Sequence, residues 1–262
     1  MTSPHIRLAF DGALARITLA RADKLNALDR CMIDALFDAA RSIDDAAAVR
    51  VAILSGEGKA FCAGGDIAAW SRLAPLAMRD WTRAGHRAFE ALARLRVPLV
   101  CTLTGHAFGG GLELAGTADI RVAEEGIRLG LPETGLGMTP GWSGTQRLAR
   151  RFGPQAVRRL ALTGDMVDAA EAHRLGLVDH VVPRGEGLAR AEAIAAGIAA
   201  RGPVATQTTK ALLNAAEGED ADLALEALAG ALTAHTEDLA EGVAAFREKR
   251  APVFGAARED TR

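Results

Sequence analysis

The chain has 262 residues, of which 49% are hydrophobic and 24% charged, and its formal net charge is −2. This composition is typical of a globular protein that is long enough for one large domain with a helical appendage. The slightly acidic balance argues against a nucleic acid or a membrane surface as partner. No apolar stretch approaches the length of a membrane span, and the N-terminal residues lack the apolar run of a signal peptide.

The three cysteines are widely spaced and form no C-x-x-C pair. This pattern argues against a disulfide framework and against a structural zinc site. Reduced thiols are typical of a cytoplasmic protein, which is the location that we expect.

The first half of the chain predicts strands that alternate with helices. Asp11-Gly12 is typical of a hairpin turn between the first two strands, and Asp29 can cap a helix that runs to about residue 45. A longer helix is predicted over 78–95. Strands are predicted where short apolar runs end at turn residues, over 6–10, 13–19, 51–54, 99–103, 119–123 and 128–130.

Helices dominate from Gly144 onward, interrupted by a brief strand over 179–182. Residues 186–250 predict three or four amphipathic helices. The order indicates an α/β fold in which repeated β-β-α units are followed by a helical C-terminal part. We divide the chain into a core at 1–200, which carries the functional site, and a helical region at 201–262.

Two glycine-rich loops each follow an apolar strand. The first, F-C-A-G-G-D-I, covers 61–67, and the second, G-H-A-F-G-G-G, covers 105–111 and leads into a short predicted helix. Loops that leave parallel strands gather at one edge of a sheet. Their backbone N–H groups could bind one carbonyl oxygen together, as in an oxyanion hole. Tight packing or a turn with positive φ is the alternative explanation for these glycines.

Two glutamates have unusual sequence surroundings. Glu113 lies two residues after the triple glycine, between Leu112 and Leu114, and this apolar setting predicts burial and a raised pKa. Glu133 lies among proline and glycine in a predicted loop. Paired carboxyl groups are suited to general acid–base chemistry. A helix-dipole effect for Glu113 and a polar loop position for Glu133 are the alternatives.

Other site types find little support. A Walker A motif is absent, and Leu114 stands where a G-x-G-x-x-G motif needs its last glycine. Ser143 in G-W-S-G-T does not complete a G-x-S-x-G nucleophile motif. The six histidines lack metal-ligand spacing, and His106, beside the second glycine loop, is interpreted as a structural hydrogen-bonding residue.

At these residues the chain resembles the crotonase (enoyl-CoA hydratase/isomerase) superfamily, from about Arg7 to Arg250. The resemblance implies a spiral of β-β-α turns followed by a helical trimerisation region. It also implies a homotrimer or a dimer of trimers. The matching motifs are K-L-N-A-L at 24–28, K-A-F-C-A-G-G-D-I at 59–67, G-H-A-F-G-G-G-L-E-L at 105–114, L-P-E-T-G-L-G-M-T-P-G at 131–141, G-T-Q-R-L at 144–148 and F-R-E-K-R at 246–250.

The resemblance further implies a lyase of fatty acid metabolism that adds water reversibly across the 2,3 double bond of an acyl-CoA thioester. Coenzyme A is then part of the substrate, and no metal or separate cofactor is expected. The positions that match the family's site are Glu113 and Glu133 as catalytic acids, Gly65 and Gly110 as the oxyanion hole, and Lys24, Ala63, Asp66, Ile67, Gly141, Trp142 and Lys249 as contacts to substrate and coenzyme A, Lys249 from a neighbouring subunit.

The presence of both glutamates favours a hydratase, because isomerases of this family often keep only the acid that matches Glu133. A Δ3,Δ2-enoyl-CoA isomerase, a dehydratase for a branched or aromatic acyl-CoA and a non-catalytic CoA-binding protein are the alternatives. Trp142 replaces the small residue of most relatives and could either narrow the acyl pocket or fill core space. We expect Trp70, Leu73, Met138 and Trp142 to build this pocket.

Overall fold

The computed structural model describes residues 3–219, 221–234 and 236–254 and divides the chain into two compact units, Met1–Lys210 and Ala211–Arg262. The sequence-based division at residue 200, with an oligomerisation role for the residues after it, stays a prediction. Among the described residues, no helix has both the length and the apolar character needed to cross a membrane.

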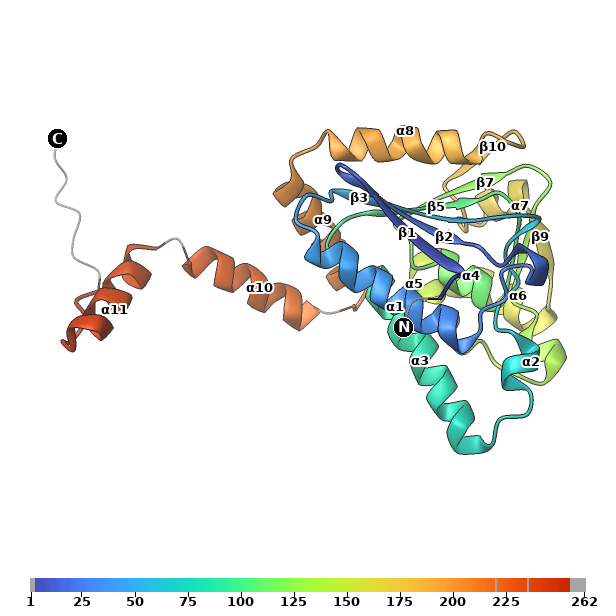
Figure 1. Ribbon diagram of the computed structural model, residues 1–262, viewed down its shortest axis with the longest axis horizontal. Coiled ribbons are helices and arrows are strands. Elements are labelled where there is room, and N and C mark those ends of the chain that lie inside the picture. Colours follow the sequence, from blue (N-terminus) through green and yellow to red (C-terminus); the bar gives the residue numbers. More distant parts are fainter. Residues whose placement is uncertain (1–2, 220, 235, 255–262) are drawn as a thin grey trace. The chain divides into compact units, whose positions relative to one another are not determined.

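A six-stranded sheet forms the centre of the first unit (Figure 1). The first two strands pair antiparallel and the others pair parallel. In spatial order the strands are β1 (Ile6–Asp11), β2 (Leu14–Leu19), β3 (Val51–Gly56), β5 (Leu99–Leu103), β7 (Ile120–Glu124) and β10 (His180–Val182). The central strands β3 and β5 are largely apolar, as expected where both faces of a parallel sheet are covered.

Four short strands of the first unit form a second sheet. In spatial order the strands are β4 (Ala60–Cys62), β6 (His106–Phe108), β8 (Arg128–Gly130) and β9 (Met166–Asp168). Along the sequence β4, β6 and β8 follow β3, β5 and β7 of the large sheet, so that each of these three turns adds one strand to each sheet. The predicted α/β fold of repeated β-β-α units is therefore confirmed.

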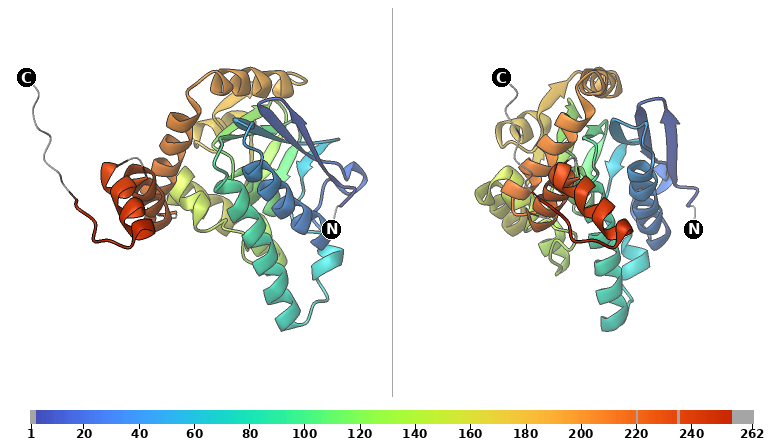
Figure 2. Two further views of the ribbon diagram at one scale, coloured as in Figure 1. Left: turned by 60° about the vertical axis from the view of Figure 1, so that its left-hand side comes forward. Right: turned by 90° about the vertical axis from the view of Figure 1, so that its left-hand side faces the viewer.

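Helices cover both faces of the large sheet (Figure 1). On one face, α1 (Arg30–Asp45) packs beside α3 (Pro75–Ala93), and their apolar residues join the main core (Figure 2). Asp29 caps α1, as predicted, because its carboxylate accepts the Met32 N–H at 2.9 Å. On the other face, α8 (Gly187–Ala199) places Ala191 and Ala195 against the valines and isoleucines of β3, β5 and β7.

Shorter helices complete the first unit, and the C-terminal region contains helices as predicted. A strand at 166–168 was not expected, nor were strands within the two glycine-rich motifs. The remaining elements are η1 (Ala22–Lys24), α2 (Ile67–Trp70), α4 (Gly110–Ala115), η2 (Glu133–Leu136), α5 (Arg147–Phe152), α6 (Pro154–Thr163), α7 (Ala169–Arg174), α9 (Pro203–Ala216), α10 (Ala221–Thr233) and α11 (Glu237–Glu248).

Candidate active site

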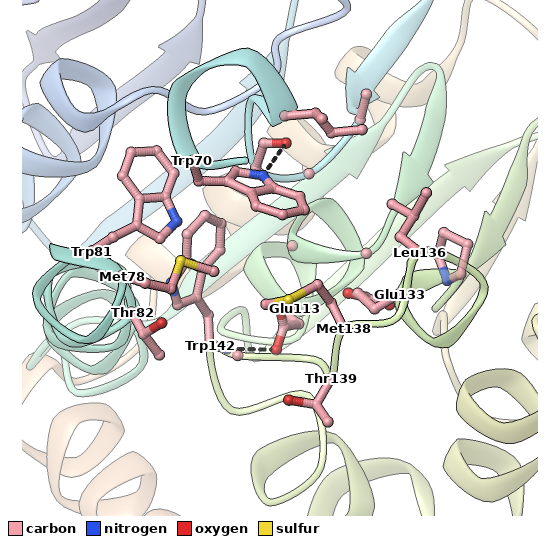
Figure 3. A pocket seen from close by; sticks show the side chains of 18 residues that line it. Trp70, Met78, Trp81, Thr82, Glu113, Glu133, Leu136, Met138, Thr139 and Trp142 are labelled. Atoms are coloured by element: carbon pink, nitrogen blue, oxygen red, sulfur yellow. Dashed lines mark hydrogen bonds between the residues drawn. The ribbon is translucent and has the colours of Figure 1, made fainter. Parts of the chain in front are cut away.

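A cavity of about 110 Å³ lies between the two glycine loops, helix α3 and the segment that follows η2 (Figure 3). Its walls are mainly apolar, and Glu113 and Glu133 are its two acidic residues. Figure 3 shows the Glu113 carboxyl group joined to Trp142 by a hydrogen bond and Glu133 beside Leu136. The larger apolar lining residues are Ile67, Trp70, Met78, Trp81, Leu136, Met138 and Trp142.

The first glycine loop is fixed by hydrogen bonds to residues 25–28. Leu28 N–H donates to Gly64 at 2.8 Å, and Asp66 N–H donates to the Leu28 carbonyl at 2.8 Å. This alternation turns the Gly65 N–H and C=O away from the neighbouring segment. The Gly65 carbonyl accepts from the Trp70 indole N–H at 3.3 Å, which leaves the Gly65 N–H on the side of the cavity.

Asn26 explains why residues 25–28 can support this loop. It has φ of +54° and is fully buried. Its side-chain amide donates to the carbonyls of Glu57 and Ala60 at 2.8 and 2.9 Å, and its side-chain oxygen accepts the Arg21 N–H at 2.8 Å. A left-handed conformation is one that Asn tolerates better than most residues, so the Asn of K-L-N-A-L suits this position.

The second glycine loop lies directly against the first. Gly109 has φ of +53°, and a Cβ added to Gly64 would lie only 3.2 Å from the Gly110 N. Gly110 begins α4, so its N–H has no acceptor within the helix. In the part of the chain that the structure describes, neither the Gly65 nor the Gly110 N–H has a hydrogen-bond acceptor. Two unpaired donors therefore border one cavity.

Glu113 is held by two backbone donors. Its Oε1 accepts the N–H of Trp142 at 2.7 Å and the N–H of Gly144 at 2.6 Å, and the residue is 2% exposed. Burial, reinforced by the neighbouring charge of Glu133, raises the pKa of Glu113 to about 7, although the two N–H bonds and Arg147 oppose this shift. The predicted burial and raised pKa are thus confirmed.

The raised pKa has a consequence for stability. Glu113→Gln keeps an oxygen that can accept both N–H bonds but removes the titration. The wild-type carboxyl has a pKa of about 7 when folded, against 4.5 as its ordinary value, so its ionisation opposes folding increasingly as pH rises between these values. We expect the variant to be more stable than the wild type by at most about 3 kcal/mol above pH 7. Urea unfolding at several pH values measures this gain, which should vanish below about pH 4.5; a pH-independent difference would contradict it.

Glu133 differs from Glu113 in its contacts. Both of its carboxyl oxygens are buried, and within the described residues they have no hydrogen-bond partner. Its Oε1 lies so close to Gly109 that a Cβ there would be 2.8 Å away. Burial raises the pKa of Glu133. Glu113 is therefore fixed by N–H donors of two other residues, whereas among the described residues only the backbone N–H of Glu133 itself opposes the raised pKa of Glu133.

Trp142 packs in the core and also lines the cavity, whereas its effect on an acyl group stays a prediction. It is 5% exposed, and its ring packs edge-on to Phe89 at 5.2 Å and tilted to Trp81 at 6.0 Å between centroids. The indole also lies against Gly110, where a Cβ would be 2.6 Å away, and it lines the cavity. A Cβ at Gly85 of α3 would overlap the indole Nε1. Trp142 therefore fills core space and forms a wall of the cavity.

The other predicted contact residues are placed differently from one another. Ala63, Ile67 and Gly141 line the cavity. Asp66 is absent from the described lining; its carboxylate caps α2 by accepting the Ala68 N–H and pairs with the Arg21 guanidinium at 2.8 Å.

Both predicted lysines lie outside the described cavity lining. Lys24 is exposed in η1, next to Leu25, whose carbonyl accepts the Ala63 N–H. Lys249 follows α11 in the second unit. Of the residues expected to build the pocket, Trp70, Met138 and Trp142 line it, whereas Leu73 does not belong to the described lining.

Helix α3 contributes lining residues that the sequence analysis missed. Met78, Trp81 and Thr82 all face the cavity. Their spacing of three and four positions is the signal that could have placed them on one helical face. The Gly144 N–H was missed as well, because a backbone donor leaves no trace in the residue type.

The comparisons with known proteins all indicate the same family. The family model described as enoyl-CoA hydratase/isomerase matches residues 9–257. The crotonyl-CoA hydratase of Syntrophomonas wolfei subsp. wolfei is 37% identical over 97% of this chain and 99% of its own length. The short-chain-enoyl-CoA hydratase of Clostridium acetobutylicum is 36% identical over 94% and 95%. The crystal structure of an enoyl-CoA hydratase from Bacillus anthracis matches with a TM-score of 0.80 and 35% identity, over 95% of this chain and 98% of that one.

Proposed function

The chain belongs to the enoyl-CoA hydratase/isomerase family, and we propose that it is an enoyl-CoA hydratase, a lyase that adds water reversibly across the 2,3 double bond of an acyl-CoA thioester. One observation carries the proposal. Two glutamates and two unpaired glycine N–H groups border the same small apolar cavity. Hydration of a conjugated thioester needs these two kinds of group together.

The glycine N–H groups would bind the thioester oxygen. Attack of water at C3 pushes the electrons of the double bond toward the carbonyl, so that negative charge collects on that oxygen. The N–H groups of Gly65 and Gly110 would stabilise this charge, and removal of one such donor typically costs about 2.7–4 kcal/mol of transition-state stabilisation. Neither N–H group has an acceptor among the residues that the structure describes, which supports this assignment.

The glutamates would move the protons. In this scheme the Glu113 carboxylate takes a proton from water as the new C3–O bond forms. The Glu133 carboxylic acid gives its proton to C2, which closes the new C2–H bond. Two N–H donors orient the Glu113 carboxyl group, and burial raises the pKa of Glu133. The charge of one glutamate disfavours the charge of the other, so the pair tends to retain one proton, which the scheme places on Glu133 when substrate is bound.

The coenzyme A portion would extend from the cavity along the first glycine loop. We propose that Ala63, Asp66 and Ile67 lie along its adenine end and that Lys24 approaches a phosphate, with Lys249 supplied by a neighbouring subunit of a trimer or a dimer of trimers. Coenzyme A is then part of the substrate, and the scheme uses no separate cofactor. The polar contacts of Asp66 with Arg21 and Ala68 support a role in fixing the loop rather than in binding the nucleotide by its carboxylate.

An absorbance assay tests the proposal. We expect crotonyl-CoA to lose the absorbance of its conjugated double bond when the wild-type protein is added, with 3-hydroxybutyryl-CoA as product. A 3-enoyl-CoA should gain little conjugated absorbance. Rapid gain from a 3-enoyl-CoA without hydration would identify an isomerase. Binding of acetyl-CoA with no turnover of 2-enoyl-CoAs of any length would identify a non-catalytic CoA-binding protein.

The activity should depend on pH in a defined direction. The pKa of Glu113 is raised to about 7 by burial, and a carboxyl group must be ionised to accept a proton from water. We therefore expect kcat/KM for crotonyl-CoA to rise with pH along a limb whose midpoint is near 7, to a plateau that ends where Glu133 loses the proton that it must donate. Initial rates across this range measure it. A profile that is flat through this range, or that falls with rising pH there, would contradict the role of Glu113 as base.

A further inference from the structure

The turn that holds Glu113 contains a strained residue. Ser143 lies between Trp142 and Gly144, the two residues whose N–H groups donate to Glu113 Oε1. Its φ is +78°, in the left-handed region, which is unfavourable for a residue with a Cβ. Glycine would adopt this conformation without strain. Some contact must therefore hold Ser143 in a conformation that its own backbone disfavours.

The contact on its side chain comes from helix α3. Ser143 is 4% exposed, and its Oγ lies 3.0 Å from Nδ1 of His86. The Ser143 carbonyl accepts the N–H of Arg147 at 2.9 Å, which joins the turn to the start of α5. The turn is thus tied to one helix by its hydroxyl group and to another by its carbonyl group.

His86 is itself held in place on α3. Its Nε2 lies 3.7 Å from Glu90 Oε1, one helical turn away. Glu90 also pairs with the fully buried Arg147 and, at 2.7 Å, with Arg94. The ion pairs of Glu90 therefore lie next to His86, whose Nδ1 contacts the hydroxyl group of Ser143 between the two donors of Glu113.

We propose that Ser143 and His86 are positioning residues for Glu113, and that their hydrogen bond maintains the left-handed turn in which the Trp142 and Gly144 N–H groups meet at Oε1. The proposal rests on the proposed function for its kinetic meaning but not for its geometry. Neither residue belongs to the described cavity lining, so neither is assigned a contact with substrate.

Loss of the hydrogen bond lets the turn relax and moves the two N–H donors away from Glu113. The carboxylate loses stabilisation, so its pKa rises further and its orientation loosens. Glu113 faces the charges of Glu133 from η2 and Arg147 from α5, which remain. Around His86, Glu90 lies on the same helix, and a surface groove beside it is lined by further charged or polar residues, namely Arg30, Asp80, Arg83, Arg87 and Gln146.

Four variants separate this role from a merely structural one. We expect Ser143→Ala and His86→Ala each to lower kcat for crotonyl-CoA hydration about ten- to a hundredfold with little change in KM, since misplacement of a catalytic group has effects of this size. The double variant should be no worse than the poorer single variant, because both act through one bond. His86→Asn, whose amide can replace Nδ1, should recover most of the loss.

Glycine at position 143 gives the sharpest comparison. Ser143→Gly adopts the left-handed turn without help, so its kcat should stay near that of the wild type. In this background His86→Ala should have little further effect, whereas in the wild-type background the same change is harmful. If His86→Ala is equally harmful in both backgrounds, the proposed action through the turn is overturned.

A titration of Glu113 gives a readout that needs no turnover. Carbon-13 NMR of the labelled carboxyl groups, assigned with Glu113→Gln, should show a higher pKa in Ser143→Ala and His86→Ala than in the wild type. Matched controls are Ser42→Ala and His173→Ala, whose side chains bond the carbonyls of Asp38 and Val178 and should leave this pKa unchanged.

These experiments distinguish failure of the proposed function from failure of the positioning role. If the wild type hydrates no 2-enoyl-CoA but the titration shifts as expected, the proposed function fails and the positioning role stands. If the wild type is active, and the Ser143→Ala and His86→Ala variants lose thermal stability but keep kcat and the Glu113 pKa, the positioning role is overturned.

Discussion

Glu113→Gln and Glu133→Gln should each lower kcat for the hydration of crotonyl-CoA by about a hundred- to ten-thousandfold, the usual range for a general acid or base. Glutamine at 113 can still accept the N–H bonds of Trp142 and Gly144 but cannot take a proton from water. Glutamine at 133 fills the same space but cannot deliver a proton to C2. Initial rates with the purified variants, at the pH plateau of the wild type, measure the loss.

Glu124→Gln is a matched control for these variants. Glu124 is 4% exposed and its Oε1 accepts the N–H of Gly187 at 3.0 Å, so it is a buried carboxylate with a backbone donor like Glu113. It lies on the sheet below α8 and outside the described cavity lining. This variant should keep the wild-type rate. Rates in Glu113→Gln and Glu133→Gln that equal that of the wild type would exclude the proton-transfer scheme.

The largest effect on stability is expected where Trp142 meets Gly85. Trp142→Ala should lower the free energy of unfolding by about 3–5 kcal/mol, because a large aromatic ring leaves the core. Gly85→Ala should destabilise the wild type by about 1–3 kcal/mol, since its Cβ overlaps the indole. In the Trp142→Ala background the same change should stabilise by about 1 kcal/mol, because alanine is the better helix former.

Gly197→Ala provides the control for helix propensity. Gly197 lies in α8, and nothing is within 4 Å of a Cβ placed there. Urea unfolding should show a gain of about 1 kcal/mol in both backgrounds. If Gly85→Ala has the same sign with and without Trp142, the two residues do not share the space that the structure gives them.

The strands and helices with long or strongly apolar patterns could be predicted from the sequence. β3 and β5 are continuous apolar runs, and α1 shows a clear cap and a clear buried face. β4, β6 and β9 could not be predicted, because β4 and β6 lie in motifs whose glycines indicate loops and β9 lies in a stretch dominated by helical patterns. They are defined by pairing within the second sheet, β4 with β6 and β9 with β8, which is a property of the tertiary fold.

The candidate active site, like the fold, could be predicted from the sequence only in part. The motifs around Glu113 and Glu133 singled out both residues, and the structure brings them to one cavity. The space that the Trp142 ring occupies could not be predicted, because it exists only where Gly85 of α3 has no side chain. The bond between Ser143 and His86 likewise joins residues 57 positions apart, and neither belongs to a motif that predicts a partner.

The three-residue turn at 142–144 contributes both to the shape of the cavity and to the environment of Glu113, so the two cannot be varied separately. Its first side chain lines the cavity that would hold the acyl group in the proposed function, while its backbone N–H groups bind the Glu113 carboxyl group. If the proposed function holds, we expect a change at Trp142 that admits longer chains also to shift the pH optimum. Any lineage or screen that selects for bulkier substrates at this position should recover second changes near Ser143 or His86 that restore the acidity of Glu113.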